Sequence, residues 1–276
     1  MLNIAVRAAR SAGNLIARNI GQQSQLTIEE KNKDDLVTNI DRECEQTVAK
    51  ILLTAYRNHS VLGEESLASG STYGNPDSEY QWVIDPIDGT TNFVMGIPHT
   101  AVSIALRHNG ITEIGVVFDP MLNEMFTAVR GKGAYLNERR IRVGTKTSLD
   151  GAIIGTAFPT RYRERMIPYL ELFSKLINNC ADVRRMGVAS LDLCYVACGR
   201  FDGYLEQGLK VWDFAAGDLI VREAGGLVTD FMGEPGYNKS GNLVCGNPKV
   251  LRNLLKVCDP QYLQSSVNFI LEKMTG

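Results

Sequence analysis

The 276-residue chain lacks long apolar runs, an excess of charge of either sign and clustered cysteines. No stretch reaches the ~18–20 consecutive apolar residues that cross a bilayer. A net charge of -2 gives no support for a mainly electrostatic nucleic-acid or membrane binder. Arginines interrupt the first twenty residues, so this segment contains no signal-peptide core. We therefore expect a cytoplasmic protein that has no membrane partner.

Cysteine and histidine are too scattered to indicate a zinc or redox centre. The six cysteines include no CxxC pair, and Cys194 and Cys198, four apart on a predicted helix, have no further ligand nearby. We expect buried free thiols instead. The three histidines lie outside every acidic motif of the chain, so we expect no histidine ligand.

The composition is that of an ordinary globular protein, with 44% apolar and 22% charged residues. The length fits one large domain or two smaller ones. In the first half, apolar spacing predicts helices over 1–20 and 41–56, joined by a loop over 21–35. Short turns between apolar segments then predict an antiparallel meander. The strands expected in this half cover 60–66, 79–85, 99–108, 112–120, 123–131 and 133–137.

After residue 150, strands and helices alternate, which favours α/β layers. We find no flexible linker, so we expect subdomains 1–150 and 151–276 to share one interface. Predicted strands cover 151–158, 201–207 and 243–246, and predicted helices cover 167–180, 188–200 and 212–226, with one or two more at the C-terminus.

Acidic residues stand beside strongly apolar sequence in four motifs. Carboxylates that converge would repel one another and take up protons, and bound cations remove that difficulty. Oxygen ligands without histidine or cysteine select hard ions, Mg²⁺ before Zn²⁺. The motifs are "LVTNID" with Asp41, "GEES" with Glu64, "DPIDGT" with Asp85 and Asp88, and "WDFAAGD" with Asp213.

The motif "DPIDGT" has the residues for phosphate chemistry. Pro86 fixes the backbone after Asp85, and that turn can aim the Ile87 carbonyl the same way as the Asp85 side chain. Gly89 permits a backbone angle closed to other residues, and "GTTN" can open a helix whose free N–H groups bind phosphate. Such a set suits two ions ~4 Å apart. Taken singly, these motifs also fit plain turns and helix caps.

The motifs in this order resemble the inositol monophosphatase family of Mg²⁺-dependent, lithium-sensitive phosphatases, and in particular its bacterial SuhB-type members. The resemblance covers essentially the whole chain. It implies an αβαβα sandwich of the inositol monophosphatase and fructose-1,6-bisphosphatase type. It also implies a homodimer that hydrolyses inositol monophosphate and related polyol phosphates. The segments that carry it are "DLVTNID", "GEES", "WVIDPIDGTTNF", "GVVFDP", "RRMG" and "WDFAAGDLIVREAGG".

The resemblance also implies a role for each site residue. Glu64, Asp85 and the Ile87 carbonyl would hold one Mg²⁺, and Asp85, Asp88 and Asp213 a second, with a third, weaker ion near Glu64. Glu64 and Thr90 would orient the attacking water, and Asp41 would hydrogen-bond Thr90. The phosphate would lie on the N–H groups of Gly89 and Thr90, and the alcohol would meet Asp88, Ala189, Glu206 and Asp213, with Arg184 at the rim.

Other functions stay open at this point. A sister phosphatase could act on 3′-phosphoadenosine 5′-phosphate, fructose 1,6-bisphosphate or histidinol phosphate. SuhB-type proteins also resemble partners of the transcription antitermination machinery, which contact RNA polymerase-associated factors. The arginine pairs 139–140 and 184–185 could serve such contacts, or they could be solvated surface. The family commonly has Ser or Thr where this chain has Val188, so we expect one hydroxyl fewer near the substrate pocket.

Overall fold

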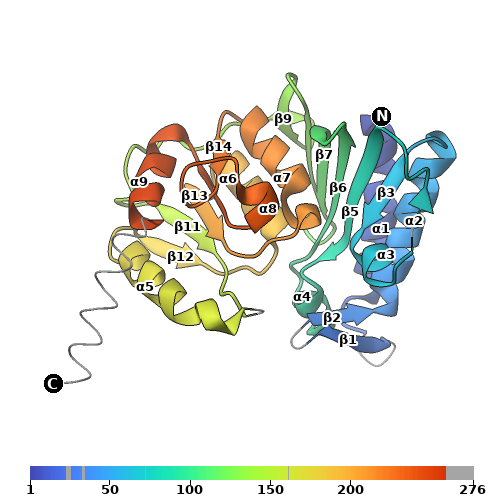
Figure 1. Cartoon of the computed structure of the whole chain (residues 1–276), viewed down its shortest axis with the longest axis horizontal. Helices are drawn as coiled ribbons and strands as arrows, with labels where there is room; N and C mark the ends of the chain where they lie inside the picture. Colours follow the sequence, from blue (N-terminus) through green and yellow to red (C-terminus); the bar gives the residue numbers. More distant parts are fainter. Residues whose placement is uncertain (23–25, 33–34, 72, 161, 259–276) are drawn as a thin grey trace.

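Helices and sheets alternate in five layers, in an αβαβα arrangement (Figure 1). The computed structural model describes residues 1–22, 26–32, 35–71, 73–160 and 162–258. The larger sheet comes from the first half of the chain and the smaller from the second, with two helices packed between them. The layered fold that the sequence predicts is confirmed.

The larger sheet contains the meander expected from the short turns. It is antiparallel except where β3 pairs in parallel with β5. Asn109 and Gly110 form the turn from β6 to β7, both with positive φ, as an "NG" hairpin requires. In spatial order the strands are β10 (Arg139–Arg140), β9 (Gly133–Leu136), β8 (Glu124–Val129), β7 (Ile111–Asp119), β6 (Ala101–His108), β5 (Tyr80–Asp88), β3 (Ser60–Gly63) and β4 (Tyr73–Gly74).

The smaller sheet mixes parallel and antiparallel pairs. The strands β12, β11 and β13 run parallel, as in α/β units. Strand β15 pairs antiparallel with β13 on one side and with β14 on the other. Strands β12 and β14 have three residues each and were not predicted from the sequence. In spatial order the strands are β12 (Asp182–Arg184), β11 (Ile153–Thr156), β13 (Gly203–Glu206), β15 (Leu243–Gly246) and β14 (Leu227–Thr229).

Both faces of the larger sheet are covered by helices, which explains its continuous apolar strands. Side chains alternate along β5, so Trp82 and Ile84 pack under α1 (Leu2–Asn19) and α2 (Asn39–Ala55), whereas Val83 packs under α6 and α7. The other long helices are α6 (Ala189–Ala197) and α7 (Val211–Glu223) between the sheets, and α5 (Met166–Ile177) and α9 (Pro248–Cys258) on the outer face of the smaller sheet.

The predicted loop over 21–35 is wrong in part, because the chain forms a two-stranded ribbon there. Strand β1 (Ile28–Asn32) pairs antiparallel with β2 (Asp35–Thr38), and Ile28 lies opposite Thr38. Ile28 of β1 is 43% exposed and Val37 of β2 is 1% exposed, so the ribbon has no repeating row of buried apolar residues that would have marked it in the sequence. The helix expected from residue 41 begins at Asn39, because Thr38 caps it together with Asp41.

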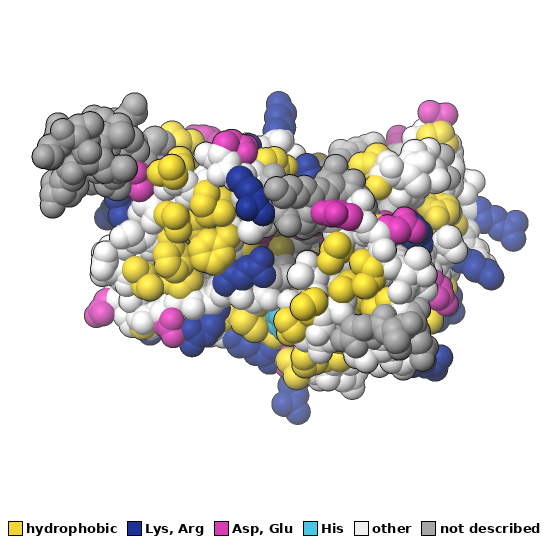
Figure 2. All heavy atoms as spheres, turned by 90° about the horizontal axis from the view of Figure 1, so that it is seen from below, with side chains coloured by type: hydrophobic (Ala, Val, Ile, Leu, Met, Phe, Trp, Pro, Cys, Tyr) yellow, Lys and Arg dark blue, Asp and Glu magenta, His cyan; other side chains and the backbone are white. Residues whose placement is uncertain are grey.

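Helix α5 leaves an apolar row open to solvent. Ile167, Leu170 and Ile177 follow one another at helical spacing and are 70%, 49% and 49% exposed. Seen from below, hydrophobic side chains gather on the lobe that carries this helix (Figure 2). Within the described ranges, no helix is long and apolar enough to cross a membrane. Any further C-terminal helix would fall in 259–276, outside the described residues.

Candidate active site

A bulge in β5 brings the two acids of "DPIDGT" to the same side of the larger sheet. Residues three apart on a regular strand point to opposite faces. Here Asp85 pairs with Ser103 and Asp88 with Ala101, so β5 has one more residue than β6 between these pairs. Pro86 has no N–H to give to the ladder, which makes this the place for an irregular step. The bulge therefore lets both carboxylates face one cavity.

That cavity, of about 170 Å³, lies between the two halves of the chain. From the first half it receives Glu64 at the start of α3 (Glu64–Ala68), and Asp85 and Asp88 from β5. The second half supplies Glu206 from the end of β13 and Asp213 from the first turn of α7. Five acids from four separate elements of the chain thus line one space. Ile87, Gly89, Thr90 and Ala189 line it as well.

Burial of these acids disfavours their charged forms. Asp85 is 2% exposed, and burial raises its pKa well above the ordinary value, with repulsion from Glu64 and Asp88 adding to the effect. Burial raises the pKa of Asp88 to about 6, against the hydrogen bond that Ser190 N donates to its Oδ2 at 2.7 Å. The pKa of Asp213 is raised well above its usual range by burial and by Asp88. Protons or cations must therefore compensate this cluster.

Thr90 and Asp41 meet at the edge of the cavity, as the resemblance implies. Gly89, with φ +90, ends β5 and places Thr90 at the start of α4 (Thr90–Val94). The Thr90 hydroxyl lies 3.1 Å from Asp41 Oδ1 and 3.0 Å from the Ile87 carbonyl oxygen, so its proton can go to either acceptor. Burial raises the pKa of Asp41 to about 6, while hydrogen bonds from Thr38 act in the opposite direction.

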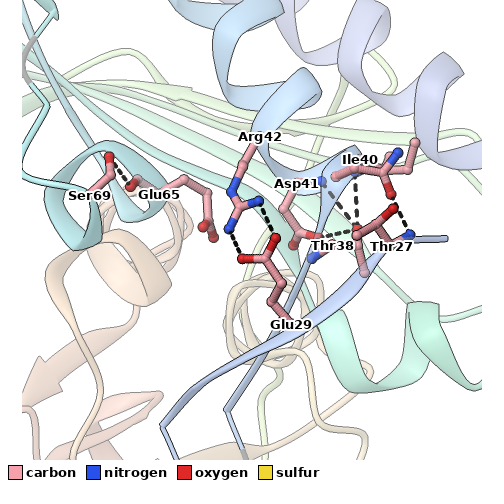
Figure 3. Close-up of polar contacts among 9 residues, drawn as sticks. Thr27, Glu29, Thr38, Ile40, Asp41, Arg42, Glu65 and Ser69 are labelled. Carbon is pink, nitrogen blue, oxygen red and sulfur yellow. Dashed lines mark hydrogen bonds and ion pairs between the residues drawn. The ribbon is translucent and has the colours of Figure 1, made fainter.

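Asp41 is held from behind by the cap of α2. Its Oδ2 accepts bonds from the Thr38 N–H at 2.8 Å and the Thr38 hydroxyl at 2.5 Å (Figure 3). The next residue, Arg42, makes a two-pronged ion pair with Glu29 and so joins α2 to the β1–β2 ribbon. One carboxylate therefore closes the helix cap and contacts the active-site threonine.

Glu45 positions Glu64 and was missed by the sequence interpretation. Its carboxylate accepts bonds at 2.8 Å from the N–H groups of Glu65 and Ser66, the free donors at the start of α3. It approaches so closely that a Cβ on Gly63 would lie 2.2 Å from Glu45 Oε2. The glycine of "GEES" is therefore required by packing, and Glu45 fixes the helix start that carries Glu64.

The two arginines of "RRMG" lie in different places. Arg184 does not line the cavity; its Nη1 lies 2.5 Å from Asp182 Oδ2 on the surface. Arg185, which was not predicted as a site residue, lines the cavity beside Gly187. Val188 does not line the cavity: its side chain is fully buried and packs behind Gly89, and its effect on substrate preference stays a prediction. The motif "RRMG" indicated an arginine at the site, but the sequence did not show which of the two adjacent arginines lines the cavity.

The donor set of the cavity fits hard cations. Asp85 Oδ1 is buried and has no hydrogen-bond partner in the described structure, so it is available to an ion. The remaining donors are carboxylates and a carbonyl oxygen, which suit Mg²⁺. As the described side chains stand, no three Asp, Glu, His or Cys residues converge tightly enough to hold one ion. A shared cation would have to draw the carboxylates closer together.

Comparison with known proteins agrees with this geometry. The model of the inositol monophosphatase family matches residues 1–260. The chain is 52% identical to "Nus factor SuhB" of Pasteurella multocida over 260 residues, which cover 94% of this chain and 96% of that one.

Solved structures give the same relationship. The extragenic suppressor protein SuhB of Bartonella henselae is 38% identical, with a TM-score of 0.89 over 93% of this chain and 97% of the other. The inositol monophosphatase of Anabaena is 36% identical, with a TM-score of 0.81 over 93% and 94%. The chain belongs to the inositol monophosphatase family.

Proposed function

We propose that the chain is a Mg²⁺-dependent phosphatase that hydrolyses inositol monophosphate and related polyol phosphates to the alcohol and inorganic phosphate. The observation that carries this proposal is the bulge in β5, which turns Asp85 and Asp88 into the cavity that Glu64 and Asp213 also line. Membership of a phosphatase family supports it. The compensating charge that these buried acids need is supplied naturally by divalent ions.

Two or three ions would be held by residues that already face the cavity. Glu64, Asp85 and the Ile87 carbonyl would hold one, and Asp85, Asp88 and Asp213 another. Bound Mg²⁺ supplies a lowered pKa for coordinated water and neutralises charge on the phosphoryl oxygens. No histidine base is then needed.

The chain's own residues position the reactants. The Thr90 hydroxyl, within hydrogen-bond distance of Asp41, would orient the attacking water together with Glu64. The N–H groups of Gly89 and Thr90 would hold the phosphate, and Asp41 would raise the basicity of the threonine oxygen.

The opposite wall of the cavity would receive the leaving alcohol. Glu206, whose Oε2 accepts the Tyr204 hydroxyl, presents a carboxylate to substrate hydroxyls together with Asp88 and Asp213. Ala189 would offer a small apolar contact at the start of α6. This wall has few side chains that could distinguish one alcohol from another, so we expect small polyol phosphates to be hydrolysed as well.

The experiment that tests this function is a phosphate-release assay on a panel of esters under saturating Mg²⁺. The panel contains myo-inositol 1-phosphate, glycerol 2-phosphate, 3′-phosphoadenosine 5′-phosphate, fructose 1,6-bisphosphate and histidinol phosphate. We expect the first two to be hydrolysed. A clear preference for one of the last three would assign the chain to a sister activity, and no release from any ester would contradict the proposal.

Asp85→Asn supplies the matched inactive enzyme for that assay. The amide cannot provide the second anionic oxygen that two ions would share. We expect at least a ~10³-fold loss of kcat/KM, about 4 kcal/mol of barrier, with an unchanged circular dichroism spectrum. Activity within tenfold of the wild type would rule out the bridging role.

A second function is favoured by the name of one relative. The Pasteurella relative, 52% identical to this chain over 260 residues, bears the name "Nus factor SuhB", and the sequence motifs resemble those of SuhB-type proteins. We propose that this chain also contacts RNA polymerase-associated factors in the cytoplasm. A reconstituted antitermination assay with the Asp85→Asn enzyme tests this: retained stimulation supports a role separate from catalysis. No stimulation by either enzyme excludes the role.

The homodimer and the two subdomains also remain proposals. The cavity takes acids from both 1–150 and 151–276, so we propose that neither half works alone. Light scattering during size-exclusion chromatography measures the subunit number directly. Expression of 1–150 by itself should give an insoluble product, because the face of the larger sheet under α6 and α7 would be exposed.

A further inference from the structure

Arg185 is the one cation among the described residues that line the cavity. Five acids line the same space, and no hydrogen bond or ion pair of the Arg185 side chain is found within the described ranges. Its neighbour Arg184 is already paired with Asp182 on the surface. A guanidinium left open to an acidic cavity is available to a ligand.

The backbone holds Arg185 in this place. Gly187 has φ +80, and a Cβ there would lie 2.4 Å from Arg185 Nη1, so the guanidinium rests directly on the glycine. The segment is braced by Asn92, whose Nδ2 donates to the Met186 carbonyl at 3.1 Å and to the His99 carbonyl at 2.9 Å. Arg185 is therefore presented by a fixed piece of chain, not by a free loop.

Arg185 follows β12 and Glu206 ends β13, the two strands that flank β11 in parallel. Both residues therefore lie at the same edge of the smaller sheet, on the side of the cavity that we expect to hold the alcohol. Burial raises the pKa values of Asp192 and Tyr169. The charge of Glu206 raises both pKa values further, and the charge of Arg185 lowers both. Arg185 thus shares its neighbours with Glu206.

We propose that Arg185 binds an anionic group on the leaving alcohol, so that esters whose alcohol carries a carboxylate or a second phosphate are preferred to neutral ones. This inference rests on the proposed phosphatase function and narrows its substrate class. A guanidinium pairs with either anion through two parallel hydrogen bonds. The carboxylate of Glu206 can accept hydrogen bonds from neutral hydroxyl groups of the alcohol, so these do not need Arg185. Neutral polyol phosphates remain substrates, with lower kcat/KM.

Two matched pairs of esters test the preference. Glycerol 2-phosphate and 2-phosphoglycerate differ only by a CH₂OH in place of a carboxylate. Inositol 1-phosphate and inositol 1,4-bisphosphate differ by one phosphate. We expect Arg185→Gln to lower the anionic-to-neutral ratio of kcat/KM roughly 10- to 100-fold, mainly through KM, in at least one pair. The pair that responds shows which anion is recognised.

Two further variants separate recognition from structure. Arg185→Lys keeps the charge and should retain most of the ratio, whereas Arg184→Gln should leave it unchanged. An equal loss on both members of each pair would mean that Arg185 contacts the transferred phosphate or merely balances Asp192, and would overturn the inference. An unchanged ratio in Arg185→Gln would overturn it too, while the phosphatase function stood. If the wild-type enzyme hydrolysed none of the four esters, both the phosphatase function and the proposed role of Arg185 would be contradicted.

Discussion

The Thr90 hydroxyl lies 3.1 Å from Asp41 Oδ1, and this contact joins the start of α4 to the cap of α2. Asp41 is 1% exposed and is held by both the N–H and the hydroxyl of Thr38. The carboxylate can therefore turn little, and together with the Ile87 carbonyl oxygen it gives the Thr90 hydroxyl two fixed acceptors. The contact links residues 49 apart in the sequence and gives Thr90 a defined orientation in the cavity.

Replacing Thr90 by valine should remove this orientation without changing the shape of the side chain. We expect kcat to fall roughly 10²- to 10³-fold, which is typical of losing one positioned proton-transfer or hydrogen-bonding group. Thr90→Ser restores the hydroxyl and should stay within about tenfold of the wild type. Steady-state kinetics on glycerol 2-phosphate checks both variants. A valine enzyme as active as the serine enzyme would show that the hydroxyl plays no part.

Gly89→Ala should disturb the active-site turn through a clash with Val188 and through backbone strain. The new Cβ would lie 2.7 Å from Val188 Cγ2, and φ +90 disfavours any residue with a Cβ. We expect lower activity and a melting temperature reduced by several degrees. The double variant Gly89→Ala with Val188→Ala removes the clashing methyl group and should recover part of the lost stability. If the double variant melts lower than the sum of the two single changes, the clash is not the cause.

Much of the fold could be predicted from local sequence, because its strands and helices bury regular apolar faces. The meander from β6 to β9 followed from short turns, and α6 and α7 followed from their apolar sequences. The ribbon β1–β2 could not be predicted, since Ile28 is exposed and the buried Val37 alone gives no repeating apolar face. Strands β12 and β14 are three residues long, too short to show a period.

The candidate site also contains residues that the sequence predicted and residues that it did not. Asp85, Asp88 and Asp213 could be predicted as site residues because acids that converge beside apolar sequence repel one another unless protons or cations compensate them. Glu45 could not, because its partners are the free N–H groups of a helix 20 residues further on. The choice between Arg184 and Arg185 depends on where β12 ends, and strand ends are poorly defined by sequence. Tertiary contacts, not residue types, decide such positions.

The ion specificity of the phosphatase should follow the size of the cations. Short acids on a bulged strand suit the ~2.0–2.1 Å bonds and octahedral order of Mg²⁺, whereas Ca²⁺ needs ~2.3–2.6 Å and more ligands. We expect Mg²⁺ to activate and Ca²⁺ to inhibit. Lithium has a size close to that of Mg²⁺ and half the charge, and we expect it to occupy the site of Asp85, Asp88 and Asp213 after the alcohol has left.

Lithium inhibition should then become stronger as the substrate concentration rises. The measurement is a steady-state titration of LiCl at several substrate concentrations, with KCl as the control for ionic strength. Relief of inhibition by excess substrate would contradict binding at the product stage. Indifference to millimolar lithium would argue against a second site built from these three acids.

Asp192 should make the stability of the fold depend on pH. It lies on α6 with no exposed surface, and neither carboxylate oxygen has a hydrogen-bond partner in the described structure. Burial, followed by repulsion from Glu206, raises its pKa well above the ordinary value. The folded chain therefore keeps a proton that the unfolded chain releases. This contribution to stability is complete below the unfolded pKa of ~3.9 and is lost as the pH rises through the folded pKa.

Asp192→Asn cannot ionise, so it should gain on the wild type as the pH is raised. We expect the free energy of unfolding of the variant minus that of the wild type to increase above pH 4, by at most about 1.4 kcal/mol per pH unit. Urea unfolding at several pH values measures this difference, and Asp77→Asn, at an exposed position, is the control that should show little dependence. A constant difference across the range would mean that Asp192 has a partner in solution that keeps its pKa ordinary. A difference that falls with pH would require that the carboxylate is stabilised in its charged form, which its unpartnered oxygens oppose.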